Sequence, residues 1–195
     1  MSQRRIRSNR RLTPIERLDI EVAGTVALDD RRGAGKTVSA FAELGDQPPL
    51  VALSLGIAAA GALRRDARLV QTGLRMLAAH SLSTMGKLLG KGLLDRTRPE
   101  DTIQQKRVYR LQEGGSEDGE LRSMPSGHSA GATAVTIAAV QDYRHLTAPV
   151  AAAAGAVMLA QLPSKNHFLT DVLAGAAVGL VAGGISLLLI PPQTD

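Results

Sequence analysis

The chain has 195 residues, a net charge of +5 and an aromatic content of 2%, and this length is enough for one domain with a substantial core. The absence of cysteine excludes disulfides and thiolate metal sites. The basic charge favours polyanionic partners, but four aromatic side chains offer little for stacking on bases, so we expect phosphate groups or an anionic membrane surface and no nucleic acid.

The N-terminal region is predicted to lie on a surface rather than to cross a bilayer. Residues 1–12 are basic, and we expect a disordered tail attracted to anionic lipid head groups. A helix-start signature follows, with Thr13 as the cap, Pro14 at the first position and Glu16 reaching back. The apolar residues on one side of this helix are Ile15, Leu18, Val22 and Val26. Residues 13–46 are therefore expected to form amphipathic interfacial helices, along a membrane surface or against a bundle.

Five apolar segments follow that could cross a bilayer. They run from Leu50 to Leu63, Leu69 to Gly86, about Ser129 to Gln141, Leu146 to Leu162 and Val172 to Ile190. A spanning helix needs roughly 20 mostly apolar residues; the fourth and fifth segments meet this requirement, whereas the first and third are marginal. The predicted fold is an all-α, multi-pass membrane helical bundle with about five spanning helices over residues 47–195. A soluble bundle of alanine-rich helices is the alternative.

The fifth segment carries a pattern for close helix packing. Gly175, Gly179 and Gly183 recur every four residues, so they share one face of a helix. Small residues at this spacing let two backbones approach closely where lipid removes the usual hydrophobic drive. Alanine-rich soluble helices share such spacing by chance, so the pattern supports the membrane bundle without deciding it.

Polar residues gather at the ends of the apolar segments in three clusters. In the first, KGLLDRTRP (residues 91–99), Lys91 and Arg98 are seven residues apart, which on a helix is two turns and one face. Two cations on one face repel unless an anion lies between them, and arginine offers a planar fork suited to phosphate oxygens. Snorkelling of both side chains at a membrane boundary explains this pair equally well.

The second cluster, PSGH (residues 125–128), supplies a tight turn followed by a helix N-terminus. The backbone N–H groups of Ser126, Gly127 and His128 lack helical partners there and can hold an anion. Gly127 allows that anion to approach the backbone.

In the third cluster, SKNHFLTDVLAG (residues 164–175), His167 and Asp171 are four residues apart. If the helix begins before His167, this spacing stacks the carboxylate under the imidazole. The carboxylate would fix the tautomer and leave the other ring nitrogen free to attack. A capping or core histidine is the alternative for one isolated histidine. Two histidines beside a Lys-x6-Arg-Pro cluster are harder to explain in that way.

With these motifs in this order, the chain resembles the type 2 phosphatidic acid phosphatases, which share a core with vanadium haloperoxidases. The family pattern is Lys-x6-Arg-Pro, Pro-Ser-Gly-His and Ser-Arg-x5-His-x3-Asp. The first two motifs are intact from Lys91 to Pro99 and from Pro125 to His128, and the third matches at His167 and Asp171. The resemblance covers roughly residues 45–190.

The resemblance implies a metal-independent phosphatase without a cofactor on a membrane helical bundle. In that mechanism His167 attacks phosphorus and forms a phosphohistidine, Asp171 orients His167, and His128 protonates the leaving oxygen. The implied phosphate-binding groups are Lys91, Arg98, Ser126 and the Gly127 amide. A site at the ends of membrane helices suits a lipid phosphate or diphosphate, of the phosphatidic acid, phosphatidylglycerol phosphate or polyprenyl diphosphate type.

One position departs from the family pattern. Six residues before His167, where the family has arginine, this chain has Gln161. Losing one charge-assisted phosphate contact costs about 1.5–3 kcal/mol. We expect Lys165 to supply a replacement cation, so that both Lys165 and Gln161 belong to the phosphate-binding set. A weakened or non-catalytic protein that binds phospholipid on the same scaffold is the alternative, and a vanadate-binding haloperoxidase is a further rival.

The acidic stretch between Pro99 and Pro125 is expected to be a solvated loop, with a lid or head-group selector as the alternative. Five crossings would put the N-terminus and all three motifs on one side of a cell membrane. The sequence leaves open which side that is, because the positive-inside rule conflicts with the family's usual outward-facing site. It also leaves the oligomeric state open.

Overall fold

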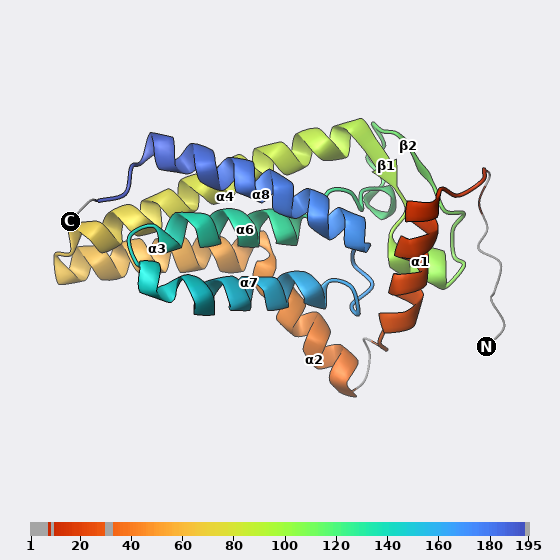
Figure 1. The fold of residues 1–195 in the computed structure, drawn as a ribbon, viewed down its shortest axis with the longest axis horizontal. Coiled ribbons are helices and arrows are strands. Elements are labelled where there is room, and N and C mark those ends of the chain that lie inside the picture. The colour runs from red at the N-terminus through yellow and green to blue at the C-terminus, as the bar shows by residue number, and fades with distance from the viewer. Residues whose placement is uncertain (1–7, 9, 30–32, 194–195) are drawn as a thin grey trace.

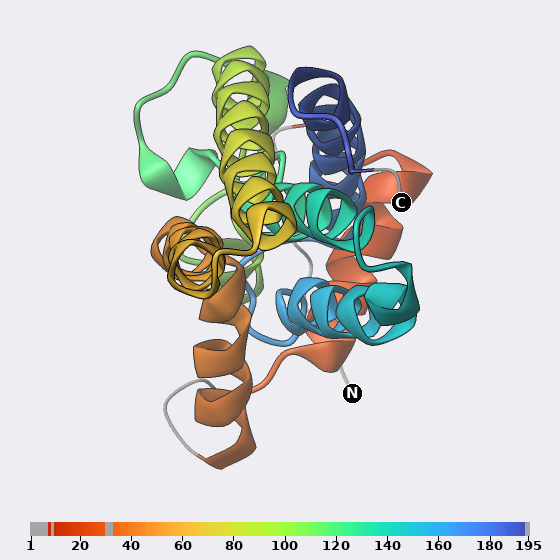
Figure 2. The same ribbon diagram turned by 90° about the vertical axis from the view of Figure 1, so that its left-hand side faces the viewer.

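A five-helix bundle forms the body of the protein in the computed structural model, which describes residues 8, 10–29 and 33–193. Its helices are α3 (Gln47–Arg64), α4 (Ala67–Leu93), α6 (Gly127–Val140), α7 (Thr147–Ala160) and α8 (Leu169–Leu189). They run along one long axis in Figure 1 and pack side by side when the bundle is seen from its end in Figure 2. Each of the five apolar segments is therefore helical, as the sequence predicts.

Glycines on α8 allow the closest contact in the bundle. A Cβ atom added to Gly175 would lie 2.3 Å from the carbonyl oxygen of Ser126, and one added to Gly179 would lie 2.5 Å from that of Ala130. At Gly183 the neighbour is the Ile137 side chain, at 2.8 Å. The predicted glycine face of α8 thus packs directly against the backbone of α6.

The helix α1 (Pro14–Val26) lies across one end of the bundle (Figure 1). The capping box of Thr13 and Glu16 is present, with Pro14 in the first turn, as predicted. The side of α1 that packs inward is the charged one, because Glu16 and Asp19 are buried while Ile15 and Leu18 are more than half exposed. Helix α1 therefore lies against the start of α8, one of its two expected positions, but through Asp19 and Ala23 rather than through the predicted apolar face.

The chain continues through α2 (Gly33–Ala42) and a 3-10 turn, η1 (Glu43–Gly45), into the bundle. Most of the predicted disordered tail lies outside the described residues. Arg10 is described, and its guanidinium forms an ion pair with Glu16.

The stretch after α4 is more ordered than the expected solvated loop. It contains two three-residue strands, β1 (Leu94–Arg96) and β2 (Leu111–Glu113), which pair antiparallel. The short helix α5 (Pro99–Ile103) and a 3-10 turn, η2 (Gly119–Leu121), complete this cap at the same end as α1. Tyr109 and Leu121 are buried within it. The described chain is mostly helical, as predicted, and the sequence analysis missed this two-stranded pair, whose three-residue strands are too short to leave a periodic signal.

At the opposite end, a buried ion pair closes the bundle. Arg75, the one charge in the second apolar segment, donates from Nη1 to Asp142 at 2.5 Å. It also donates to the carbonyl oxygens of Ile190 and Pro191, so it ties α4 to the residues that follow α8. The turn η3 (Arg144–Leu146) lies at this end, between α6 and α7.

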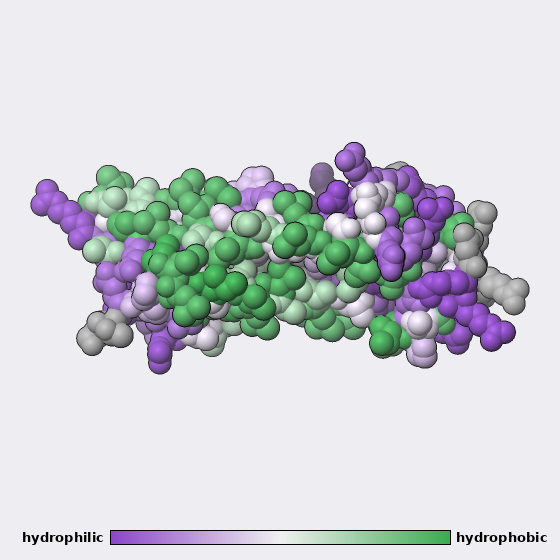
Figure 3. Space-filling view, turned by 90° about the horizontal axis from the view of Figure 1, so that it is seen from above, coloured by the Kyte–Doolittle hydropathy of each residue, from purple (hydrophilic) through white to green (hydrophobic). Residues whose placement is uncertain are grey.

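Hydrophobic side chains cover the middle of the molecule, and hydrophilic ones gather at its two ends (Figure 3). Within the described chain, α8 is the one helix that is long and apolar enough to cross a membrane, with a mean hydropathy of 2.3. Large apolar side chains are nonetheless exposed along the other bundle helices, including Leu53, Leu88 and Leu159. The predicted number of about five spanning helices stays a prediction.

Candidate active site

The two histidines of the motifs face each other at the α1 end of the bundle. His128 lies in the first turn of α6, and His167 lies in the connection from α7 to α8. Their ring centroids are 5.9 Å apart with an interplanar angle of 61°. At this separation both rings can border the same phosphoryl group.

His167 has one ring nitrogen bound and the other available. Its Nδ1 lies 2.8 Å from the backbone carbonyl oxygen of Ser123. Because a carbonyl oxygen only accepts, Nδ1 carries the proton and Nε2 carries the lone pair. The ring is 2% exposed, and burial, followed by the charges of Arg98, His128 and Lys91, holds the pKa of His167 well below its ordinary value. His167 is therefore neutral at physiological pH, as a nucleophile must be.

Asp171 supports this arrangement indirectly. Helix α8 begins at Leu169, after His167, so the condition for direct stacking is not met, and Asp171 Oδ2 lies 4.0 Å from His167 Nδ1. The same oxygen accepts from Ser123 Oγ at 2.6 Å and from the Phe168 N–H at 2.9 Å. The expected direct hydrogen bond to the ring is corrected to a link through Ser123, which the sequence analysis did not identify.

The PSGH motif forms the expected turn and helix start. Ser126 is the N-cap of α6, and its Oγ accepts from the Ser129 N–H. The Ser126 N–H was predicted to be free to hold an anion, but it donates to the backbone oxygen of Asp171 at 3.0 Å. No described residue accepts from the N–H groups of Gly127 and His128. These two amides point from a helix N-terminus, where an anion is favoured.

Lys91 and Arg98 reach the site from two different elements. Lys91 is in the last turn of α4, whereas Arg98 follows β1 and caps α5, so the predicted shared helical face is wrong. Arg98 is held by its Nε, which donates to the carbonyl oxygen of Gly119 at 3.2 Å. After burial, the charges of both cations lower the pKa of His167, so both lie near its ring. Neither forms an ion pair with a carboxylate of the described chain.

A second lysine on α4 lies beside the PSGH turn. An added Cβ on Gly127 would meet the Lys87 side chain, with Cδ at 2.7 Å and Nζ at 3.3 Å. Gly90 packs in the same way against Pro125. Lys87 precedes Lys91 by one helical turn, and this spacing was the only sequence signal for it.

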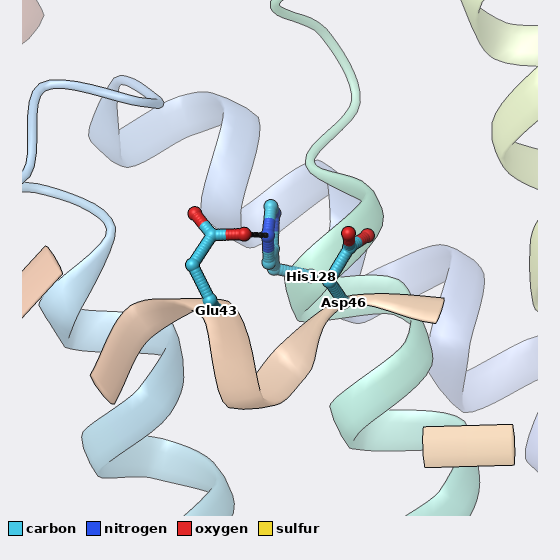
Figure 4. A group of neighbouring side chains, drawn as sticks. All are labelled: Glu43, Asp46 and His128. Atoms are coloured by element: carbon cyan, nitrogen blue, oxygen red, sulfur yellow. Dashed lines mark ion pairs between the residues drawn. The ribbon is translucent and has the colours of Figure 1, made fainter. Parts of the chain in front are cut away.

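Two carboxylates flank His128 on opposite sides (Figure 4). Glu43 Oε2 lies 3.8 Å from His128 Nε2, and one ligand atom from each of Glu43, Asp46 and His128 falls within 4.8 Å of the others. Burial lowers the pKa of His128 below its ordinary value, and the charges of Asp46 and Glu43 oppose that shift because they favour the protonated ring. The two carboxylates could also hold a cation, but a cation there would occupy the nitrogen that a proton donor needs. The sequence analysis missed both residues, which precede the motifs by more than 40 positions.

Gln161 is buried, and its side-chain amide is hydrogen-bonded to protein groups in α2, in α7 and in the loop that follows α7. Its Nε2 donates to the carbonyl oxygens of Ala42 at 2.9 Å and Val157 at 3.4 Å, and its Oε1 accepts from Asn166. These bonds use both amide hydrogens, so Gln161 holds the loop to the end of α2 and has no donor left for the expected phosphate contact. Lys165 is 6% exposed and has a left-handed backbone, with φ 59°, two residues before His167.

Comparison with known proteins adds a family and a fold. The sequence pattern described as "PAP2 superfamily" matches residues 69–195. Among solved structures, LpxE of Aquifex aeolicus is similar with a TM-score of 0.64 and 21% identity, over 88% of this chain and 95% of LpxE.

A second similar structure is the first transmembrane PAP2-type phosphatidylglycerolphosphate phosphatase from Bacillus subtilis. Its TM-score is 0.45 at 21% identity, over 88% of this chain and 92% of that one. No curated protein matches the sequence. The likeness to LpxE shows a common fold, which extends into the first 68 residues that the family pattern leaves out.

Proposed function

Because the chain belongs to the PAP2 superfamily, we propose that it is a metal-independent membrane phosphatase acting on a lipid phosphate or diphosphate. The proposed substrates are of the phosphatidic acid, phosphatidylglycerol phosphate or polyprenyl diphosphate type. One observation carries the proposal: two imidazoles 5.9 Å apart, one with a free Nε2, beside two cations that have no carboxylate partner among the described residues. This set can attack a phosphoryl group, protonate its leaving oxygen and balance its charge.

In the first step, the Nε2 lone pair of His167 attacks phosphorus and the bond from phosphorus to the lipid oxygen breaks. His128 gives its proton to that oxygen, so the lipid leaves as an alcohol or, from a diphosphate, as a monophosphate. The phosphorylated ring of His167 carries a positive charge, which the nearby Asp171 carboxylate stabilises. In the second step, His128 takes a proton from water, the hydroxide attacks phosphorus, and the phosphorus–nitrogen bond breaks.

The phosphoryl oxygens need positive groups on the side away from the lipid. Lys91 and Arg98 supply charge, and the N–H groups of Gly127 and His128 supply directed donors. The Ser126 hydroxyl, which accepts from Ser129, keeps its own hydrogen for the phosphate. Such preorganised donors stabilise charge as it spreads over the oxygens in the transition state.

A membrane location is supported by the shape and the surface of the molecule. The apolar middle lies between two hydrophilic ends (Figure 3), as in a bundle that spans a bilayer. Helix α1 lies across the bundle axis (Figure 1) with Ile15 and Leu18 exposed. We propose that its apolar side rests in the interface, close to the basic tail and anionic head groups.

The proposal is tested by measuring phosphate release from a panel of lipid phosphates and diphosphates with EDTA present. Wild type should release phosphate, and His167→Ala should not. His145→Ala is the matched control, because His145 is an exposed histidine in η3 at the other end of the bundle. Lipid binding without turnover in wild type would favour the alternative, a phospholipid-binding protein. The reason for considering it is that the uncharged Gln161 stands where the family has arginine. Halide oxidation that requires vanadate would favour a haloperoxidase.

We also propose that Lys165 replaces the family arginine as a phosphate-binding cation. Its support is a buried position two residues before His167. Lys165→Gln keeps a long polar side chain but removes its positive charge. It should lower kcat/KM about 10-fold or more, as expected for a lost charge-assisted hydrogen bond to the phosphate. Unchanged kcat/KM in Lys165→Gln would refute this role.

A further inference from the structure

A buried arginine outside the recognised motif residues connects α1 to the proposed active site. Arg96 on β1 is 1% exposed. Its guanidinium donates from Nη1 to Asp171 Oδ1 at 2.6 Å and from Nη2 to Asp19 Oδ2 at 2.7 Å. Its other partners are Thr170 Oγ1 at 2.6 Å, Tyr109 Oη at 3.2 Å and the ring of Phe168, with a centroid 4.3 Å away. A planar group bound on this many sides has one orientation.

Asp19 binds the start of α8 as well as Arg96. Its Oδ1 accepts from the Thr170 N–H at 3.1 Å, and its Oδ2 also accepts from Thr170 Oγ1. Asp19 is 2% exposed and comes from α1. A residue from the N-terminal helix therefore caps the first turn of the helix that carries Asp171, where the helix dipole favours a carboxylate.

The charges of this cluster depend on one another. Asp19 and Asp171 are both buried, and two carboxylates that share one site repel each other unless a cation lies between them. Arg96 lies between the two carboxylates and pairs with both, so it offsets their repulsion. Asp19 completes the coordination that fixes Arg96.

The cluster continues to the attacking ring. Asp171 accepts from the Ser123 hydroxyl, and the Ser123 carbonyl oxygen accepts from His167 Nδ1. A displacement of Asp171 would move Ser123, which selects the tautomer of His167. The charges of Asp19, Arg96 and Asp171 sum to one negative unit, close to the ring that becomes cationic when it is phosphorylated.

We infer that Arg96 and Asp19 are positioning residues for the nucleophile, acting through Asp171 and Ser123, and that α1 is a structural part of the active site. This inference rests on the proposed function. It adds Asp19, which lies outside the matched residues 69–195, and gives Arg96 a task that differs from phosphate binding by Arg98 two residues later.

The test compares Asp19→Asn with a control on the same helix, Glu21→Gln, whose side chain is exposed. Asp19→Asn keeps the shape and removes the charge. We expect kcat for the lipid phosphate to fall about 10- to 100-fold, the range for a lost hydrogen bond to a charged group, with KM close to wild type. The thermal midpoint should fall as well, because the buried Arg96 loses one of its two carboxylate partners. Arg96→Lys keeps the charge but cannot bridge two carboxylates, so kcat should fall in that variant too. Glu21→Gln should match wild type.

A second readout does not depend on turnover. Nitrogen NMR of the four histidines, assigned with single His→Gln variants, reports which ring nitrogen of His167 carries the proton. Wild type should show Nδ1–H alone, and Asp19→Asn and Arg96→Lys should show a mixture of tautomers. If wild type releases no phosphate, the proposed function fails while this measurement still decides the positioning role.

An Asp19→Asn protein that is folded, with wild-type kcat and an unmixed His167 tautomer, would overturn the inference. If Asp19→Asn does not fold, Tyr109→Phe replaces it, since that variant removes the phenol oxygen that accepts from Arg96 Nη2 and leaves both carboxylate partners of Arg96 in place. A several-fold lower kcat with unchanged KM in Tyr109→Phe supports the role of Arg96. Wild-type kinetics in that variant contradict it.

Discussion

Replacing Gly175 with alanine tests how closely α8 must approach the start of α6. The added Cβ would lie 2.3 Å from the Ser126 carbonyl oxygen, whereas ordinary contact begins at 3.4 Å. The neighbour is backbone, so the two helices must separate by about 1 Å at this level. Asp171, one turn earlier on α8, and the amide of Gly127 would move apart with them. A misplacement of about 1 Å costs on the order of 100-fold in rate, and we expect that loss in kcat.

The assay is phosphate release from a lipid phosphate, with circular dichroism to verify the helical content. Gly184→Ala is the matched control, because it lies on the same helix with no atom within 4 Å of an added Cβ and should leave kcat unchanged. Gly179→Ala meets the Ala130 oxygen one turn further from the site and should lower stability more than kcat. Wild-type kcat in Gly175→Ala would refute the claim that this helix contact positions the site.

Three further predictions concern charge. Glu43→Gln should move the alkaline limb of the activity profile to lower pH, by less than about one unit, because Glu43 is 59% exposed and the Coulomb energy at 3.8 Å is about 1 kcal/mol in water; an unmoved limb would exclude it as a partner of His128. Burial, followed by the neighbouring Glu120 carboxyl, raises the pKa of Asp101 to about 6. The contribution of Asp101 to stability is therefore complete below pH 3.8, the ordinary value, and lost as pH rises through about 6; thermal midpoints over this range should fall in wild type and not in Asp101→Asn. Arg75→Met should cost about 3–5 kcal/mol because it leaves a buried carboxylate unpaired, as denaturant unfolding would detect.

Local signals in the sequence predict the helices and their caps. The five apolar segments, the capping box at Thr13 and the glycine face of α8 depend on residues within four positions of one another, and the structure contains all three. The converging histidines were predicted only through a family resemblance. The seven-residue spacing of Lys91 and Arg98 predicted one shared helical face. This was wrong because α4 ends between them and the chain continues as β1.

Long-range pairs left no local signal. Asp19 and Arg96 are 77 positions apart, and Asp19 and Thr170 are 151 apart. On an amphipathic helix, the charged side is usually taken as the solvated one, so the buried face of α1 was assigned to the wrong residues. Ser123 escaped notice for another reason: it binds His167 through a backbone carbonyl, which every residue possesses.

The hydrogen bonds between Asp19 and Thr170 have a consequence for how the chain sits in a cell. They bind α1 to the start of α8, so α1 and the proposed site face the same aqueous phase. A fluorescent label at an exposed position of α1, such as Glu21, would report which aqueous phase that is, even before the substrate lipid is known.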